Sequence, residues 1–213
     1  MSSLATRLHQ LFSHQPRLKF PFDDATIPKN GIYIIFEAGE SFQNMDRIVR
    51  IGTHTGSNQL PSRLKQHFIK PNKNRSIFRK NIGRCFLNRD NQNYLPIWEL
   101  DPTPRAGRDK KLQLIDQDYE KQLEEKISDY IQNNLSFCVF EVSTKEERLF
   151  WESRLVSTLA QSGEIKPSTV WLGNHSTRPK IAKHGLWQVN ELNKAVLTEA
   201  EFTQLEKLVK SSN

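Results

Sequence analysis

Two side chains that can act on one anionic ligand stand four residues apart, at Arg63 and His67. Arginine carries a permanent positive charge, and histidine can donate or accept a proton near neutral pH. Leu60 and Leu64 recur at helical spacing, which predicts a helix over residues 59–67 with these leucines on its buried side. Positions i and i+4 of a helix face the same way. Both polar side chains can therefore reach the same ligand.

A carboxylate stands where the sequence predicts a buried surface. Residues 145–161 are predicted to form a helix, and its apolar stripe contains Leu149, Leu155, Val156 and Leu159. At about 100° per residue, Glu152 falls inside that stripe. Burying an ionised carboxylate is costly unless it is paired with a cation or bound to a metal. Glu152 is therefore expected to have either an arginine partner or a metal ion.

Positive charge is concentrated in one part of the chain. The formal net charge is +7, and residues 47–89 contain no Asp or Glu. The cations of this segment are Arg47, Arg50, Arg63, Lys65, Lys70, Lys73, Arg75, Arg79, Lys80, Arg84 and Arg89. Such a segment is typical of a polyanion partner, because Lys and Arg that neutralise phosphates release condensed counterions. A solvated basic face is the alternative.

A β-hairpin is the predicted framework for these side chains. Residues 31–36 and 47–52 are short β-branched segments, separated by a loop over residues 37–46. Side chains alternate along a strand, so Tyr33 is expected on the opposite face from Ile32 and Ile34.

The predicted fold class is α+β, with a small, three-stranded, mainly antiparallel sheet flanked by helices. A strand over residues 135–142 completes the sheet. We divide the chain into an N-terminal extension (1–27), a core (28–190) with an insertion at about 87–134, and a C-terminal helix and tail (191–213). A long amphipathic helix is expected over residues 109–134, which either packs on the domain or forms a homodimer interface.

The order of these motifs resembles the GIY-YIG nuclease superfamily over roughly residues 28–190. The resemblance is carried by Gly31-Ile32-Tyr33, Ile51-Gly52, Arg63, His67, Glu152 and Asn174. His175 replaces Asn174 as the match if the alignment shifts by one residue. Arg50 stands where the family usually has the Tyr of its second tripeptide.

This resemblance implies a metal-dependent DNA endonuclease, acting in restriction, in other defence against foreign DNA, or in repair. It implies that Glu152 holds a single Mg²⁺ or Mn²⁺ and that Arg63 balances charge on the phosphoryl oxygens. Tyr33 would accept a proton from the attacking water, and His67 would hydrogen-bond the phosphate or the water. Asn174 would help to organise the site.

The departure at Arg50 is expected to support the same chemistry. Arg50 would lie beside Tyr33 across the hairpin, where a cation favours the phenolate. DNA contacts are expected from Lys65, Lys70, Lys73, Arg75, Arg79, Lys80 and Arg84. Two other classes stay open: a catalytically inactive GIY-YIG-like DNA-binding module, and a structural RNA-binding protein, for which no motif with aromatic stacking platforms is present.

Hydropathy and cysteine content predict the location of the protein and the state of its thiols. No window approaches the run of about 18 apolar residues needed to span a bilayer, so a cytoplasmic protein without a membrane partner is expected. Cys85 and Cys138 are the two cysteines of the sequence and form no Cys-x-x-Cys pair. They are expected to be reduced core residues.

Overall fold

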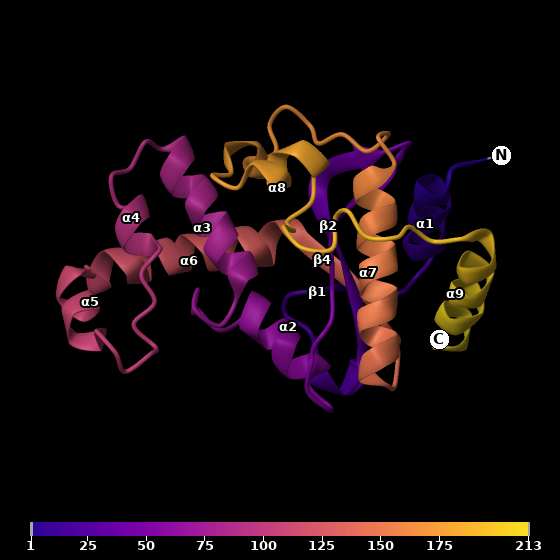
Figure 1. Ribbon diagram of the computed structural model, residues 1–213, viewed down its shortest axis with the longest axis horizontal. Helices are drawn as coiled ribbons and strands as arrows, with labels where there is room; N and C mark the ends of the chain where they lie inside the picture. The colour runs from indigo at the N-terminus through magenta and orange to yellow at the C-terminus, as the bar shows by residue number, and fades with distance from the viewer. Residues whose placement is uncertain (1, 213) are drawn as a thin grey trace.

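The computed structural model describes residues 2–212 as an antiparallel sheet with helices against both faces (Figure 1). The strands are β1 (Leu18–Lys19), β2 (Gly31–Phe42), β3 (Met45–Gly52) and β4 (Leu135–Glu141), in the spatial order β1-β4-β2-β3. The three expected strands are present, and β1 is a two-residue addition at the edge, paired with β4. The α+β class is confirmed.

The hairpin of β2 and β3 is longer than the sequence suggested. Its strands continue through residues 37–46, where a loop was expected, and they turn at Gln43 and Asn44. Both turn residues have positive φ, as a two-residue hairpin turn requires. Polar residues caused the wrong prediction: Glu37 and Glu40 are buried in the strand, and each has hydrogen-bond partners. Glu37 accepts from the indoles of Trp171 and Trp187, and Glu40 accepts from Arg47 and Ser168.

One face of the sheet packs against α1 (Leu4–Ser13), α7 (Lys145–Gln161) and α9 (Glu199–Ser211), which lie on the right in Figure 1. Ile32, Ile34 and Phe36 point into this core. The capping box of α9 is present, with Thr198 as the N-cap and Glu201 three residues later. Both termini of the described chain thus end in helices that share one core with α7.

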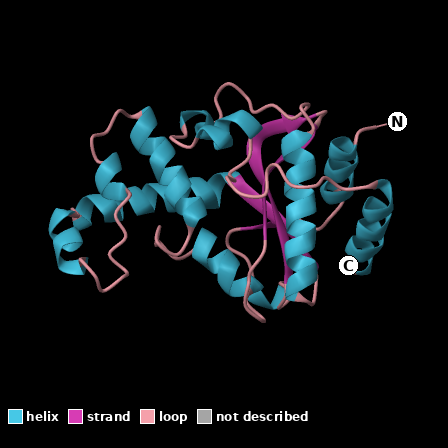
Figure 2. Ribbon diagram, in the orientation of Figure 1, coloured by secondary structure: helices cyan, strands magenta, loops and turns pink. Residues whose placement is uncertain are grey.

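The other face carries Tyr33 and Ile35, as strand alternation predicts. It packs against α2 (Leu60–Phe68), α3 (Ile77–Arg89) and α6 (Gln117–Asn134). The short helices α4 (Leu95–Trp98) and α5 (Arg108–Leu114) lie at the outer end of this layer, and α8 (Pro179–His184) and two 3₁₀ turns, Asp24–Thr26 and Leu172–His175, complete the fold (Figure 2).

The single helix expected over residues 109–134 is two helices. Ile115 leaves the helical conformation, and Asp116 begins α6 as an N-cap whose side chain accepts from the backbone N–H of Tyr119 over 3.0 Å. An N-cap residue favours a new helix start over continuation of the old one. The apolar side of α6, at Leu123, Ile127 and Ile131, is buried against the sheet layer.

Both cysteines are free and buried, as expected. Burial raises the pKa of the Cys85 and Cys138 thiols to about 12, so both are inert thiols at neutral pH. No helix within residues 2–212 has the length and apolarity to cross a membrane.

Candidate active site

The hairpin places a tyrosine side chain across a glycine. Tyr33 pairs with Gly52 in the register of β2 and β3. A Cβ atom built on Gly52 would overlap the Tyr33 hydroxyl and the ring carbon that bears it, so a larger residue would displace the phenol. Tyr33 itself has no exposed surface. The Ile-Gly end of β3 thus fixes the position of the Tyr33 hydroxyl.

Polar side chains from two other elements meet at this hydroxyl. The Oη atom of Tyr33 lies 2.9 Å from Nε2 of His67 on α2, and Arg50 on β3 donates from Nε to the same oxygen over 3.4 Å. On the other side of the imidazole ring of His67, Nδ1 lies 2.7 Å from Oγ of Ser76. Ser76 is the N-cap of α3 and accepts from the backbone N–H of Arg79. We call Arg50, Tyr33, His67 and Ser76 the buried network.

A cavity of about 390 Å³ adjoins the buried network. Arg50 belongs to both, because its side chain lines the cavity and donates to Tyr33. Arg63 from α2 and Glu152 from α7 line the same cavity, together with Asn81, Gln188 and Glu191. Side chains from β3, α2, α3, α7 and residues 187–191 therefore converge here.

Glu152 occupies an environment that disfavours its charge. Burial raises the pKa of Glu152 above its ordinary value of 4.5; Arg50 opposes this shift, and the nearby carboxylate of Glu191 adds to it. Arg50 and Arg63 share the cavity with Glu152, but within residues 2–212 neither forms a direct ion pair with it. Arg50 and Arg63 thus attract the Glu152 carboxylate electrostatically, without the direct contact of an ion pair.

The donor set fits a hydrated divalent cation. Mg²⁺ is usually held by one or two carboxylates, with waters and substrate phosphates as its other ligands. Glu152 and Glu191 line one cavity and can supply two such carboxylates. The described residues contain no group of three or more His, Cys, Asp or Glu that could hold a metal by themselves. Water and substrate would therefore complete the coordination of a Mg²⁺ or Mn²⁺ at Glu152.

His67 is neutral at neutral pH. Burial lowers its pKa well below 6.5, and the positive charges of Arg63, Arg50 and Arg79 lower it further. A neutral imidazole has one nitrogen that donates and one that accepts. His67 can therefore pass a hydrogen bond between its two neighbours but adds no positive charge to the site.

Comparison with known families covers almost the whole chain. A model of the GIY-YIG domain matches residues 2–213. The chain belongs to the GIY-YIG family. No curated protein and no solved structure matches it. The family expected from the motifs at residues 31–33 and 51–52 is therefore confirmed. GIY-YIG domains form a family of nucleases that act on DNA.

The GIY-YIG motif residues fall into two layers. Tyr33 and His67 belong to the buried network, whereas Arg63 and Glu152 line the cavity. Arg50, at the position of the family's second tyrosine, connects the two layers, because it donates to Tyr33 and lines the cavity. The expected contact between Arg50 and Tyr33 across the hairpin is present.

Asn174 is not brought to the cavity. Its side chain is exposed, and its amide donates to the backbone carbonyls of Ser168 and Thr169 over 2.8 and 3.2 Å. It therefore stabilises the turn before the second 3₁₀ segment. The alternative match, His175, is also exposed and does not line the cavity either.

Amide side chains line the cavity instead. They belong to a segment, residues 187–191, that sequence patterns did not identify. Gln188 accepts a hydrogen bond from the backbone N–H of Ile51 over 3.1 Å, and the backbone N–H of Trp187 donates to Val49 over 2.7 Å. These bonds attach residues 187–188 to the outer edge of β3. No periodic pattern covers this segment, so the sequence did not place it against the sheet, where Trp187 is buried.

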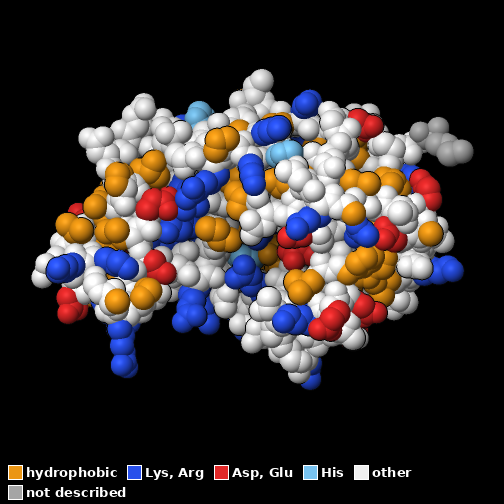
Figure 3. Space-filling model, in the orientation of Figure 1, with side chains coloured by type: hydrophobic (Ala, Val, Ile, Leu, Met, Phe, Trp, Pro, Cys, Tyr) orange, Lys and Arg blue, Asp and Glu red, His pale blue; other side chains and the backbone are white. Residues whose placement is uncertain are grey.

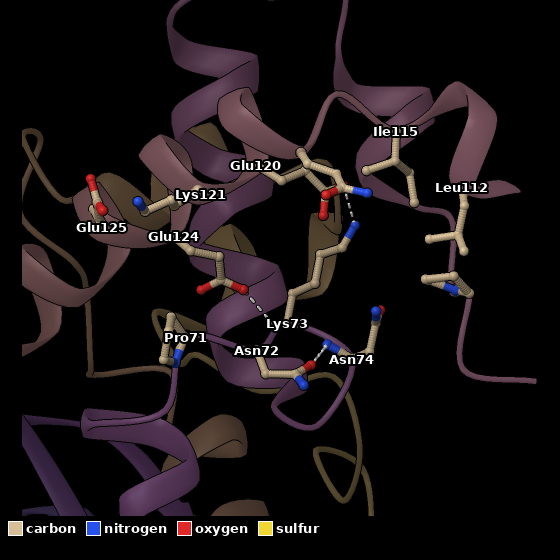
Figure 4. Close-up of a pocket in the computed structure, with 12 residues that line it drawn as sticks. Pro71, Asn72, Lys73, Asn74, Leu112, Ile115, Glu120, Lys121, Glu124 and Glu125 are labelled. Carbon is tan, nitrogen blue, oxygen red and sulfur yellow. Dashed lines mark hydrogen bonds and ion pairs between the residues drawn. The ribbon is translucent and has the colours of Figure 1, made fainter.

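Much of the basic segment serves the fold and not a ligand. Figure 4 shows Lys73 between two carboxylates of α6: its Nζ lies 2.6 Å from Glu120, and its backbone N–H donates to Glu124. This arrangement corrects the expectation that Lys73 contacts DNA, since its side chain is 3% exposed.

Three further cations of the expected DNA surface are bound to carboxylates. Arg79 makes two hydrogen bonds to the Glu124 carboxylate and has no exposed surface. Arg84 forms a two-pronged pair with Glu99, and Lys80 lies 3.6 Å from the same carboxylate. The carboxylates of Glu99, Glu120 and Glu124 thus neutralise four cations of the basic segment. These pairs join distant segments, so sequence order does not reveal them.

Exposed cations are nevertheless present near the site. Lys70 and Arg75 are exposed, and their side chains have no ion pair within residues 2–212. Lys65 is half-exposed and pairs with Asp24. Figure 3 shows Lys and Arg side chains gathered over the middle of this face, between α3 and α7.

Proposed function

We propose that this GIY-YIG protein is a metal-dependent DNA endonuclease that hydrolyses phosphodiester bonds. The observation that carries the proposal is the convergence of Glu152, Arg50 and Arg63 on one cavity, with the Tyr33 phenol bonded to the arginine that lines it. These groups supply a metal ligand, positive charge for phosphoryl oxygens and a proton acceptor, which are the functions that phosphodiester hydrolysis needs.

Each residue has one role in this proposal. Glu152 holds a divalent cation, with Glu191 as a neighbouring carboxylate, and the cation when bound supplies charge stabilisation at the phosphate and at the leaving oxygen. Arg63 binds the phosphoryl oxygens. It is half-buried, and donates to the Gln66 side chain and the Arg75 carbonyl over 3.1 Å each, which holds its guanidinium in place.

Tyr33 takes the proton from the attacking water. A general base must come within hydrogen-bond reach of that proton, and Tyr33 is fully buried in the free protein. The water therefore reaches Oη where Arg50 now stands. The contact between Arg50 and Tyr33 is the longest in the buried network, at 3.4 Å. We place the opening of this contact at the step where the phosphate binds and attracts the guanidinium.

Nicking of supercoiled plasmid tests the proposal. The purified protein is incubated with and without Mg²⁺ or Mn²⁺, alongside Tyr33→Phe and Glu152→Ala. We expect metal-dependent nicking that falls by about 10² or more in Tyr33→Phe and is lost in Glu152→Ala. The fragment pattern will distinguish a sequence-specific, restriction-type enzyme from a non-specific one.

Matched controls separate chemistry from folding. Glu146→Ala changes an exposed carboxylate on the same helix as Glu152, and Tyr119→Phe removes a hydroxyl on α6. Both should cut at the wild-type rate. A protein that shifts DNA in a gel but never cuts it, and that binds DNA equally well as Glu152→Ala, would be a catalytically inactive binding module.

A further inference from the structure

Two buried amide side chains lie beside Arg50 and Arg63 in the cavity. Asn81 on α3 is 1% exposed and Gln188 is 7% exposed, and both line the cavity that contains Glu152. A buried amide normally has hydrogen-bond partners at both its oxygen and its nitrogen. In these two side chains only the oxygen has a partner within residues 2–212. The two amide nitrogens therefore need an explanation.

The orientation of the Asn81 amide is fixed by an arginine. Nη1 of Arg84 donates to Oδ1 of Asn81, and Arg84 makes two further hydrogen bonds to the Glu99 carboxylate. Because a guanidinium can only donate, the amide oxygen must face Arg84. Nδ2 of Asn81 has no acceptor in the described chain, yet the protein does not enclose it. Its N–H groups are therefore open to the cavity.

The orientation of the Gln188 amide is fixed by the backbone of β3. The N–H of Ile51 donates to Oε1 of Gln188 over 3.1 Å. A backbone N–H can only donate, so Oε1 and not Nε2 faces the strand. Within residues 2–212 Nε2 also lacks an acceptor, and the protein does not enclose it. The cavity thus has free N–H donors from α3 and from the segment that follows α8.

The occupied oxygens exclude two other roles for these amides. Mg²⁺ binds oxygen ligands, and both amide oxygens already accept hydrogen bonds. Asn and Gln read an adenine base with oxygen and nitrogen together, which the same bonds prevent. Each amide can therefore serve a ligand only as a donor. The non-bridging oxygens of a phosphodiester fit this requirement, since they accept hydrogen bonds and donate none.

We infer that Asn81 and Gln188 are catalytic residues that donate hydrogen bonds to the non-bridging oxygens of the phosphodiester at the site of cleavage. The inference rests on the proposed nuclease function, to which it adds two neutral donors beside Arg63. Fixed donors, including Asn and Gln side chains, stabilise the negative charge that develops on an oxygen in the transition state. Both amides are already held by other groups of the protein, so they need no reorientation when the phosphate binds.

Substitutions that keep the amide oxygen test the two donors. Asn81→Asp and Gln188→Glu keep an acceptor for Arg84 and for Ile51 but replace the NH₂ group with an oxygen. Each is expected to slow single-turnover cleavage of a DNA duplex about 10²-fold or more. Asn93→Asp adds the same charge at an exposed position that does not line the cavity. This control should cut at the wild-type rate.

A neutral substitution separates the lost donor from the added charge. Asn81→Ala removes the donor, and Arg84 keeps both hydrogen bonds to Glu99. Cleavage should slow by a similar factor, whereas duplex binding should weaken much less, because the charge on these oxygens grows in the transition state. If Asn81→Ala and Gln188→Glu both cut at the wild-type rate, the inference is wrong.

Nuclear magnetic resonance tests the contact without cleavage. The side-chain NH₂ signals of Asn81 and Gln188 in ¹H–¹⁵N spectra are identified by their loss in Asn81→Asp and Gln188→Glu. Dimethyl phosphate, a phosphodiester without a base or a sugar, should shift both signals in the metal-free protein, and sodium chloride at the same ionic strength should not. Signals that shift with a DNA duplex but not with dimethyl phosphate would show contacts to bases or sugars and would overturn the inference.

The outcomes separate the two proposals. If dimethyl phosphate shifts both amide signals but the wild type cuts no DNA with any metal, the proposed nuclease function fails, while phosphodiester binding by Asn81 and Gln188 stands. If the wild type cuts DNA but dimethyl phosphate shifts neither signal, the nuclease function stands and the inference is wrong.

Discussion

At the scale of single residues, Glu152 is held in an environment that disfavours its ionised form. Burial raises the pKa of its carboxyl, so the folded state binds this proton more tightly than the unfolded state does. Below pH 4 both states are protonated, and the carboxyl costs nothing. As the pH rises through the folded-state pKa, ionisation destabilises the fold.

Replacement of this carboxylate should therefore stabilise the protein. Glu152→Gln is expected to raise the Tm at pH 7–8 by about 2–4 °C for each kcal/mol of relieved cost, with the difference shrinking as the pH falls toward 4. Scanning calorimetry across this pH range measures it. In the same experiment Mg²⁺ should raise the Tm of the wild type and not that of Glu152→Gln. A Tm below that of the wild type at pH 8 would contradict the account.

At the scale of elements, the β2–β3 hairpin holds the Tyr33 hydroxyl in place. Gly52→Ala introduces a Cβ atom that overlaps the Tyr33 hydroxyl, so we expect the phenol to move away from His67. Displacement of a catalytic group by about 1 Å can slow a reaction about 100-fold. Single-turnover nicking measures the effect. Ser41→Ala is the control, because it changes an exposed side chain of the same hairpin, and equal activity of the two variants would show that the register does not position Tyr33.

A buried ion pair joins α3 to α6. Arg79 and Glu124 are both nearly inaccessible to solvent, and removing one partner of such a pair typically costs about 3–5 kcal/mol because it leaves an unpaired charge. Urea unfolding of Glu124→Ala should show this loss, whereas Glu125→Ala, at the exposed neighbouring position, should change little. Similar stabilities for the two variants would mean that the pair does not hold α3 in place.

The exposed cations are expected to contribute to DNA binding, whereas the cations paired with carboxylates are not. Lys70→Ala and Arg75→Ala remove exposed charges, so each is expected to reduce the slope of log K against log salt by about 0.9 if it contacts a phosphate, with little change in stability. Fluorescence anisotropy with a labelled duplex measures the slope. Unchanged slopes in both variants would place the DNA elsewhere on the surface.

Sequence patterns predicted the regular elements well where one periodicity dominated. The strands at residues 31–36 and 47–52 and the helix over 145–161 follow from alternation and from a clear apolar stripe. The extension of the hairpin was missed because Glu37 and Glu40 are polar yet buried, with partners from residues 168–187 that lie far away in sequence. The break at Ile115 was missed because the apolar spacing continues across it.

The cavity could be predicted only in part, for a similar reason. Arg63 and Glu152 were identified from local spacing and from the resemblance to a family. Gln188 and Glu191 reach the cavity because Trp187 and Gln188 bond to the edge of β3, and no local pattern encodes that contact. Likewise, the ion pair between Arg79 and Glu124 is a contact between residues far apart in sequence. Counting charges along the chain cannot show it.

At the scale of the whole molecule, the assembly state would decide how the proposed nuclease cuts DNA. The apolar side of α6, which the sequence offered as one dimer interface, is buried within the domain. We therefore expect a monomer in sedimentation velocity. One active site cuts one strand at a time, so nicked circles should accumulate before linear plasmid appears. A stable dimer that produces linear plasmid without a nicked intermediate would contradict this expectation.

The most direct test of the central claim is the single-turnover cleavage of a labelled DNA duplex by the wild type, Glu152→Gln and Glu146→Gln in Mg²⁺ or Mn²⁺. We expect metal-dependent cleavage by the wild type and by Glu146→Gln, and none by Glu152→Gln despite its intact fold. Cleavage by Glu152→Gln at the wild-type rate, or wild-type cleavage that does not depend on added metal, would contradict the claim that Glu152 holds the metal of a phosphodiesterase site.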